Sequence, residues 1–252
     1  MAMLANPLPQ LTDDPTGRTL GLDLPPGRVI GPTADPLLWY ADAPAAPADW
    51  KRLAPARRAA GLHPVLLGGI QELADWELAP EEMSYPGDHD AEDVLEELWA
   101  GHAAGLGHGA EDWPGLAEGP EPREDPECSA AEVAAAATCE GHLKGARAAL
   151  VPARRSADVP AALGWHGPEN HEYDVARLCA VLRSWEDRFG ARVVGLSPTC
   201  LTVSVAAPPT DEDEALVLAA EHFAFCPDGV ETDLAQYAES LRRGASWTFW
   251  WD

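Results

Sequence analysis

The last seven residues, Ser246–Asp252, read SWTFWWD and contain three tryptophans. A chain end normally frays into solvent, so an end this apolar is expected to be packed. It follows a helical pattern that stops at Gly244, and its residues would alternate between two faces of a strand: Trp247, Phe249 and Trp251 on one, Thr248 and Trp250 on the other. Apolar groups on both sides predict a terminal strand covered on both faces. The alternative to a packed strand is an exposed apolar peptide that binds a partner protein.

The segments just before this end are the most legible in the sequence. Val175–Phe189 repeats apolar residues at helical spacing, starts after a possible cap at Asp174 and stops at Gly190. The β-rich runs 191–197 and 200–207 predict a hairpin. A second helix is expected after a cap at Thr210, where acidic residues fill the first turn.

The first half contains weaker signals of the same kinds. Strands are expected at 27–31, 36–42, 63–69 and 146–153. Helices are expected at 49–62, after a cap at Asp90, and from Ser129, where Glu132 completes a capping box. The stretch 158–174 is predicted to be a turn-rich connection.

This order of elements predicts an α+β (α/β-type) protein in two lobes. Residues 128–252 would form a C-terminal domain with a mixed β-sheet packed by helices. Residues 1–127 would form a smaller, acidic α+β lobe that ends in the loop-rich linker EGPEPREDPE (118–127).

Charge is the strongest signal in the composition. The chain has 42 acidic and 17 basic residues, a net charge of −25. Between Gln71 and Glu127 lie 18 acidic residues and one base, Arg123. Such a field repels nucleic acid and anionic lipid and attracts basic proteins or cations. The alternative is that the acids only keep the protein soluble.

The sequence favours a cytoplasmic protein that does not cross a membrane. It has no apolar run of about 18 residues, and its start lacks the basic and apolar regions of a secretory signal. Five cysteines without a C-x-x-C pair are typical of reduced thiols rather than a disulfide framework. The oligomeric state is left open.

Motifs of the common enzyme classes are absent from the sequence. Glycine-rich phosphate loops, H-E-x-x-H, G-x-S-x-G and basic-aromatic nucleic-acid motifs do not occur. No catalytic residue, cofactor or metal is therefore predicted. Arg183 and Asp187, four residues apart on a helix, are expected to form a surface pair.

Six residues are candidates for a ligand pocket. They come from GWHGPEN (164–170) and EHFAFCPD (221–228) and are Trp165, His166, Asn170, His222, Cys226 and Asp228. Loops carry sites more often than core helices do, although Asn170 also suits a turn. His222 and Cys226 share a helix face and could bind zinc or form a nucleophilic pair, but their aromatic neighbours favour buried core residues. Cys139 and His142, with Cys128, are a weaker zinc candidate.

Four long strings in the second half belong together: LVPARRSADVPAALGWHGPEN (150–170), RSWEDRFGARVV (183–194), AAEHFAFCPD (219–228) and WTFWWD (247–252). Over roughly residues 146–252 the chain resembles the bacterial family of domains of unknown function DUF4253. GLHPVLL (61–67) and ELAPEEMSYPGDHD (77–90) resemble the N-terminal region of its actinobacterial members. CPDGVETD (226–233) is shorter than in members that carry an insertion there. The resemblance implies a fold unit and no reaction.

Two functions remain in competition. The first is a non-catalytic acidic module of the immunity or antitoxin kind, which covers a basic protein partner and needs charge complementarity but no chemistry. Its partner-binding residues would be Glu92, Asp93, Glu96 and Glu97, on the polar face of one helix. The second is an enzyme or small-ligand protein that uses the pocket of Trp165, His166, Asn170, His222, Cys226 and Asp228.

Overall fold

The computed structural model describes residues 6–33, 35–69, 76, 78–103, 112–121, 124–230 and 232–252. Its strands are β1 (Gly27–Ile30), β2 (Leu38–Ala41), β3 (Leu62–Leu67), β4 (Arg147–Pro152), β5 (Arg192–Leu196), β6 (Cys200–Ser204) and β7 (Ser246–Trp250). They form one mixed sheet in the order β1-β2-β4-β3-β5-β6-β7. β3 and β5 are parallel, and all other neighbours are antiparallel. The chain therefore has the predicted α+β fold.

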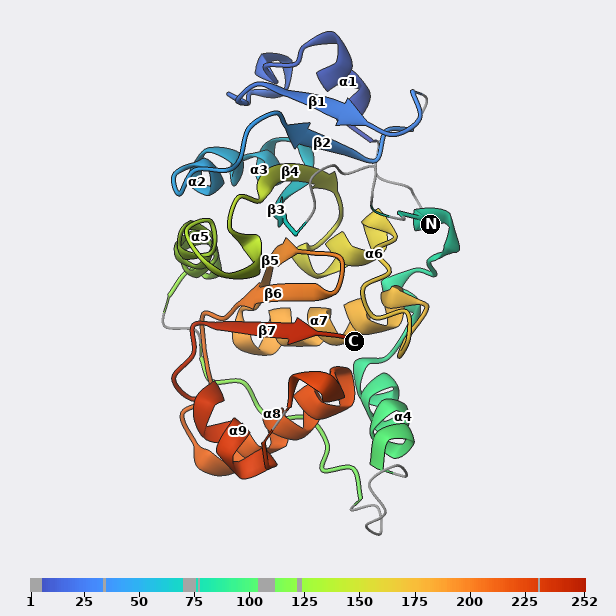
Figure 1. Cartoon of the computed structure of the whole chain (residues 1–252), viewed down its shortest axis with the longest axis vertical. Helices are drawn as coiled ribbons and strands as arrows, with labels where there is room; N and C mark the ends of the chain where they lie inside the picture. Colours follow the sequence, from blue (N-terminus) through green and yellow to red (C-terminus); the bar gives the residue numbers. More distant parts are fainter. Residues whose placement is uncertain are drawn as a thin grey trace.

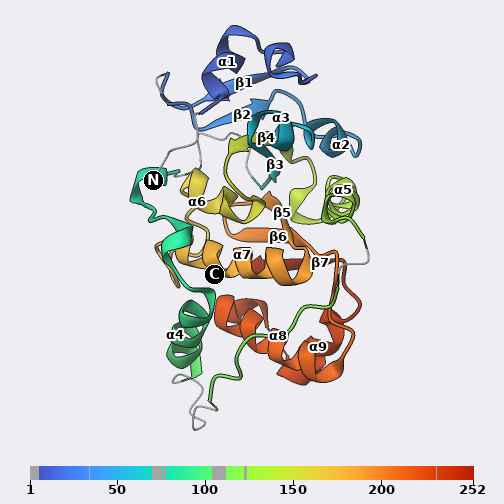
Figure 2. The same cartoon turned by 180° about the vertical axis from the view of Figure 1, so that it is seen from behind.

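Helices pack on both faces of this sheet. On one side lie α1 (Leu8–Asp13), α2 (Asp49–Leu53), α3 (Ala56–Ala60) and α5 (Pro126–Ala137), which bury a core with Trp39, Leu62 and Val194. On the other lie α4 (Ala91–Ala103), α6 (Val159–Leu163), α7 (Val175–Phe189), α8 (Glu212–Phe225) and α9 (Leu234–Leu241). The larger core on that side includes β7. The middle strands thus lie between two layers of helices (Figures 1 and 2).

The sheet runs through both predicted lobes. β3, which precedes residue 127, lies between β4 and β5, which follow it. β2 pairs with β4 in the same way. Strands from the two sides of the 127/128 boundary therefore alternate in one sheet. Whether residues 1–127 and 128–252 fold as separate units stays a prediction.

The terminal segment is a strand, as predicted, but only one of its faces is covered. Trp247, Phe249 and Trp251 are buried against α7 and α8, whereas Ser246, Thr248 and Trp250 are exposed. The expectation of cover on both faces is wrong, because no helix of the α5 side lies over β7 in the described part of the chain. Figure 1 looks onto this open face, and Figure 2 shows α7 in front of the same strands.

Three predicted helix boundaries are also wrong. The helix expected at 49–62 is two short helices, because Pro55 cannot continue the first and is instead the N-cap residue of α3. α5 starts at Pro126 with Asp125 as its cap, three residues before the expected Ser129. Asp211, rather than Thr210, caps α8 through the backbone N–H groups of Asp213 and Glu214. The caps predicted for α4 and α7 are confirmed.

Candidate functional site

Within the acidic segment 71–127, the residues predicted to bind a partner lie on the outward face of α4. Asp90 begins this helix by accepting hydrogen bonds from the backbone N–H groups of Glu92 (2.9 Å) and Asp93 (3.2 Å). Val94, Leu95 and Trp99 are buried on the inner face. The carboxylates predicted to bind a partner are all exposed on the outer face: Glu92, Asp93, Glu96 and Glu97.

α4 is fixed to the body of the protein by aromatic contacts of its inner face and by one ion pair. The Trp99 ring meets Phe223 of α8 with 5.8 Å between ring centroids and Trp113 with 5.9 Å. Arg177 of α7 binds Glu97 (2.6 Å) and Glu172 (3.3 Å). Because one carboxylate of the outer face is thus paired, Glu92, Asp93 and Glu96 are the ones that meet no basic group among the described residues.

A buried ion pair fixes the acidic segment that follows α4. Glu221 of α8 is 0% exposed and forms a two-pronged ion pair with Arg188 of α7, at 2.8 and 2.6 Å. Its two oxygens also accept from Trp185 Nε1 and from the backbone N–H of Ala117, both at 2.8 Å. Arg188 donates back to the Ala117 carbonyl at 2.5 Å. Residues 112–121 are thereby held across α8, between α4 and α5 (Figure 2).

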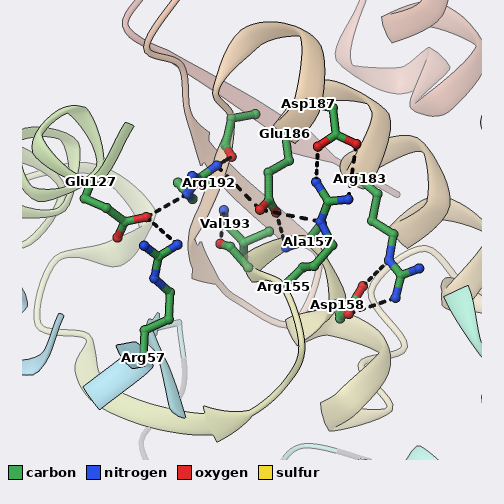
Figure 3. Close-up of polar contacts among 12 residues, drawn as sticks. Arg57, Glu127, Arg155, Ala157, Asp158, Arg183, Glu186, Asp187, Arg192 and Val193 are labelled. Atoms are coloured by element: carbon green, nitrogen blue, oxygen red, sulfur yellow. Dashed lines mark hydrogen bonds and ion pairs between the residues drawn. The ribbon is translucent and has the colours of Figure 1, made fainter. Parts of the chain in front are cut away.

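Four arginines form ion pairs in a separate, electrically balanced cluster (Figure 3). Glu127 Oε1 accepts from Arg57 (3.0 Å) and Arg192 (2.8 Å). Arg192 and Arg155 both lie near Glu186, at 3.6 and 3.5 Å. Two further ion pairs join Arg155 to Asp187 and Arg183 to Asp158. Four arginines thus meet four carboxylates.

This cluster corrects one prediction and bears on the surface charge. Arg183 does not pair with Asp187. Its guanidinium donates hydrogen bonds to both carboxylate oxygens of Asp158, at 2.5 and 2.9 Å. Over the described part of the chain ten of the 17 basic residues form ion pairs. Of these ten, Arg177 is the one that pairs with a carboxylate of α4.

Three of the six predicted ligand residues converge on the end of the chain. Trp165 is buried, donates from Nε1 to the Ser197 carbonyl (2.8 Å) and packs edge-on against Trp251. Asn170 donates to the Asp252 carbonyl at 3.1 Å. Asp228 accepts from the Asp252 N–H (3.2 Å) and lies 3.0 Å from His171 Nε2. These contacts secure the terminal strand.

His222 and Cys226 lie inside the protein, behind β7. His222 is 0% exposed, and its ring is surrounded by those of Trp185, Trp247, Phe249 and Tyr237. Cys226 donates its thiol to the Trp250 carbonyl (3.0 Å), and burial raises the pKa of this thiol to about 12. A protonated thiol is neither a nucleophile nor a metal ligand at neutral pH.

The sixth residue, His166, lies apart from the others. Its Nε2 is 3.5 Å from Glu82, and its ring meets that of Tyr173. His222 is enclosed by aromatic rings while His166 faces Glu82, and a pocket that joins them with Asn170 stays a prediction. None of the six lines either of the two hollows described below.

A serine and a histidine that the sequence did not single out lie close together nearby. Ser84 Oγ is 2.6 Å from His89 Nε2, and Asp174 accepts from the Ser84 N–H at 3.1 Å. Asp174 lies 3.9 Å from the same ring nitrogen rather than from Nδ1. A nucleophilic triad needs the carboxylate on the opposite ring nitrogen, so these three residues do not form one.

Two residues of the weaker zinc candidate, His142 and Cys139, are bonded to separate partners in the fold. His142 Nε2 is bonded to Thr202 Oγ1 at 2.9 Å, and Cys139 points its thiol at the Ala135 carbonyl. Among the described residues, no group of three or more histidine, cysteine, aspartate or glutamate side chains is arranged to hold a metal. In the same part of the chain no helix is long and apolar enough to span a bilayer.

Burial of His222 makes stability depend on pH. Loss of hydration, with the positive charge of Arg188 nearby, lowers its pKa from 6.5 to about 3. Below pH 6.5 His222 therefore binds a proton in the unfolded chain but stays neutral in the folded protein. The free energy of unfolding consequently falls as the pH falls. By this site alone, the free energy of unfolding should drop by about 2 kcal/mol between pH 7 and pH 5.

The measurement is urea unfolding of wild type and His222→Phe at pH 7 and pH 5. The variant is expected to lose less stability than wild type over this interval. His63 acts in the same direction, since burial lowers its pKa to about 4, so some decrease should remain. Equal decreases in the two proteins would contradict the assignment to His222.

Comparison with known proteins agrees with the resemblance noted in the sequence. Residues 147–252 match the model of the family described as domain of unknown function (DUF4253). The matched region includes β4 to β7 and α6 to α9. No curated protein and no solved structure is significantly similar to the chain.

Proposed function

We propose, taking residues 147–252 as a domain of the DUF4253 family, that the chain is a non-catalytic acidic binding module that covers a basic protein partner. The mode of action is that of an immunity protein or antitoxin, which blocks an enzyme by occupying its surface. The observation that carries the proposal is the exposed face of α4, whose carboxylates Glu92, Asp93 and Glu96 lack basic partners among the described residues.

The mounting of α4 supports this function. A binding face works best when it is already in its bound shape, because ordering it on association weakens affinity. α4 is anchored to α7 and α8 by Trp99 and by the Arg177–Glu97 pair. Its carboxylates are thus presented on a rigid helix.

The charge distribution supports the nature of the partner. Complementary charge speeds diffusional encounter and rejects partners of like sign. With a net charge of −25, and arginines already engaged in ion pairs, the surface favours basic proteins and disfavours nucleic acid. Such binding requires no reaction, cofactor or metal.

Neutralising α4 should slow association with the partner. In Glu92→Gln/Asp93→Asn/Glu96→Gln, the rate constant is expected to fall about tenfold at low salt and to depend less on salt, because the local field is reduced. Above about 0.15 M salt the difference should shrink, since the Debye length is then about 8 Å. The measurement is association kinetics over a salt series, with the protein recovered by affinity capture from the native host.

The matched control removes three charges from the other end of the molecule. Asp13→Asn/Asp23→Asn/Asp35→Asn causes the same change in net charge near α1 and β1, far from α4 (Figure 1). This control should keep nearly the wild-type salt dependence. Identical salt slopes in all three proteins would mean that the acids of α4 only keep the protein soluble.

A further inference from the structure

One part of the sheet lacks the outer layer of helices that covers the rest. α2, α3 and α5 pack over β3, β4, β5 and β6, but the same face of β7 is open (Figure 1). Two of the side chains that β7 exposes there are small and polar, Ser246 and Thr248, and the facing residues of β6, Thr202 and Ser204, are buried. The third is Trp250, at 38% exposed. An exposed tryptophan beside an open sheet is a typical anchor residue in a protein interface.

A groove runs between α5 and this open face. It is a hollow of about 430 Å³, lined by Glu132, Val133, Ala136, Ala137, Glu140, Gly141, His142, Leu143, Thr202, Ala245, Ser246 and Thr248. We call it the α5–β7 groove. A smaller hollow of about 290 Å³ adjoins it and shares Glu132, Val133 and Ala245.

The groove is lined by small side chains where α5 and the sheet meet. Its wall on α5 presents Ala136 and Ala137, and its floor presents Thr202, Ser246 and Thr248. Small side chains such as these let a second helix approach α5 to about 8–10 Å.

The rim of the groove is negatively charged. Glu132 and Glu140 are exposed on the α5 side, and Glu121 and Glu124 border the adjoining hollow. The one arginine or lysine that lines either hollow, among the residues the structure describes, is Arg243, which is ion-paired with Glu239. A second copy of this chain would bring more negative charge and be repelled.

We propose that the α5–β7 groove receives an α-helix of a basic partner protein. The helix lies beside α5 on β7, where the outer layer is missing, and directs lysine or arginine side chains to Glu132 and Glu140. The exposed side chain of Trp250 packs against this helix. This inference rests on the proposed function and adds a second contact surface to the one on α4.

The test uses a synthetic probe, so that no natural partner is needed. The probe is an amidated peptide of about 18 residues, about 27 Å long as a helix, with alanine and leucine at helical spacing flanked by lysine. Its control has the same composition and two central prolines, which break the helix. Binding is measured by fluorescence anisotropy at fixed salt, and binding sites by amide chemical shifts in NMR spectra.

Three variants distinguish the groove from the general charge. Glu132→Gln/Glu140→Gln should weaken binding of the helical peptide about fivefold, as loss of two rim ion pairs implies. Ala136→Trp fills the groove without changing charge and should weaken binding more than tenfold. Thr248→Trp, at an exposed strand position, blocks the floor independently should the first filling variant not fold. Glu92→Gln/Asp93→Asn/Glu96→Gln should leave peptide binding within about twofold of wild type.

Each outcome of these binding measurements either supports or overturns the inference. Loss of binding in the groove variants with retention in the α4 variant supports the inference, as do shifts confined to α5, β6 and β7. Loss only in the α4 variant overturns it while the proposed function stands. Binding to none of the proteins, together with unchanged salt slopes for the natural partner, overturns both. Equal binding of the proline peptide, or a dimer of this chain that Ala136→Trp dissociates, overturns the choice of a helix as occupant.

Discussion

Replacement of Phe249 by alanine is expected to lower the free energy of unfolding by about 3–5 kcal/mol, a large share of the about 5–15 kcal/mol of a typical domain. The Phe249 side chain is 1% exposed and lies parallel to the Trp185 ring, with centroids 5.4 Å apart. It also meets His222 and Phe225. The truncation would leave a cavity among rings that α7, α8 and β7 all contribute.

The neighbouring residue provides the control. Trp250 is the larger side chain, but it points to the open face of the sheet. Trp250→Ala should therefore change stability by about 1 kcal/mol or less. Urea unfolding of the two variants gives both values. If they were equal, or if Trp250→Ala were the more harmful, the orientation of the terminal strand would be wrong.

The same strand shows what local patterns can predict. The alternation in Ser246–Trp250 fixes which side chains share a face, since the two-residue period belongs to the strand itself. α7 was predictable in full because Asp174 caps it, Gly190 ends it and its apolar stripe is continuous. Which helices cover each face of the sheet is decided by distant segments. The open face of β7 therefore could not be predicted from the strand itself, apart from the hint given by its Ser and Thr residues.

The order of the strands could not be read from the sequence. β3 lies between β4 and β5, although about 80 residues of chain separate it from β4, and parallel pairing of β3 with β5 joins segments further apart still. No composition shift at residue 127 reports on such pairing. The acidic character of residues 71–127 is a property of composition and does not predict which strands pair.

The predicted site illustrates the same limit in side-chain contacts. Arg183 and Asp187 have ideal helical spacing, yet each is engaged by a residue from another element: Asp158 and Arg155. A buried or two-pronged pair outweighs a surface contact worth a few tenths of a kcal/mol. His222 and Cys226 were recognised as possible core residues from their aromatic neighbours, and the structure encloses both. Ser84 and His89 carried no signal, since their approach depends on an irregular turn.

Replacement of Arg188 by methionine is expected to lower the free energy of unfolding by about 3–5 kcal/mol, because it leaves the buried charge of Glu221 without its cation. Methionine preserves the stem of the side chain, so the loss reports on charge more than on volume. The hydrogen bond from Arg188 to the Ala117 carbonyl disappears as well, which frees the segment that crosses α8. The amide of Ala117 should therefore exchange with solvent faster than in wild type, a local readout beside global urea unfolding.

The exposed ion pair of Arg243 with Glu239 supplies the matched control, and Arg243→Met should cost about 1 kcal/mol or less. In the double variant Arg188→Met/Glu221→Gln no charge is left buried, so the loss should be smaller than the sum of the single losses. The difference measures the coupling of the two groups across α7 and α8. A loss below about 1 kcal/mol in Arg188→Met would mean that Trp185 and Ala117 alone satisfy the carboxylate. In that case the Arg188–Glu221 ion pair would not be the contact that holds the acidic residues 112–121, which follow α4, against the core.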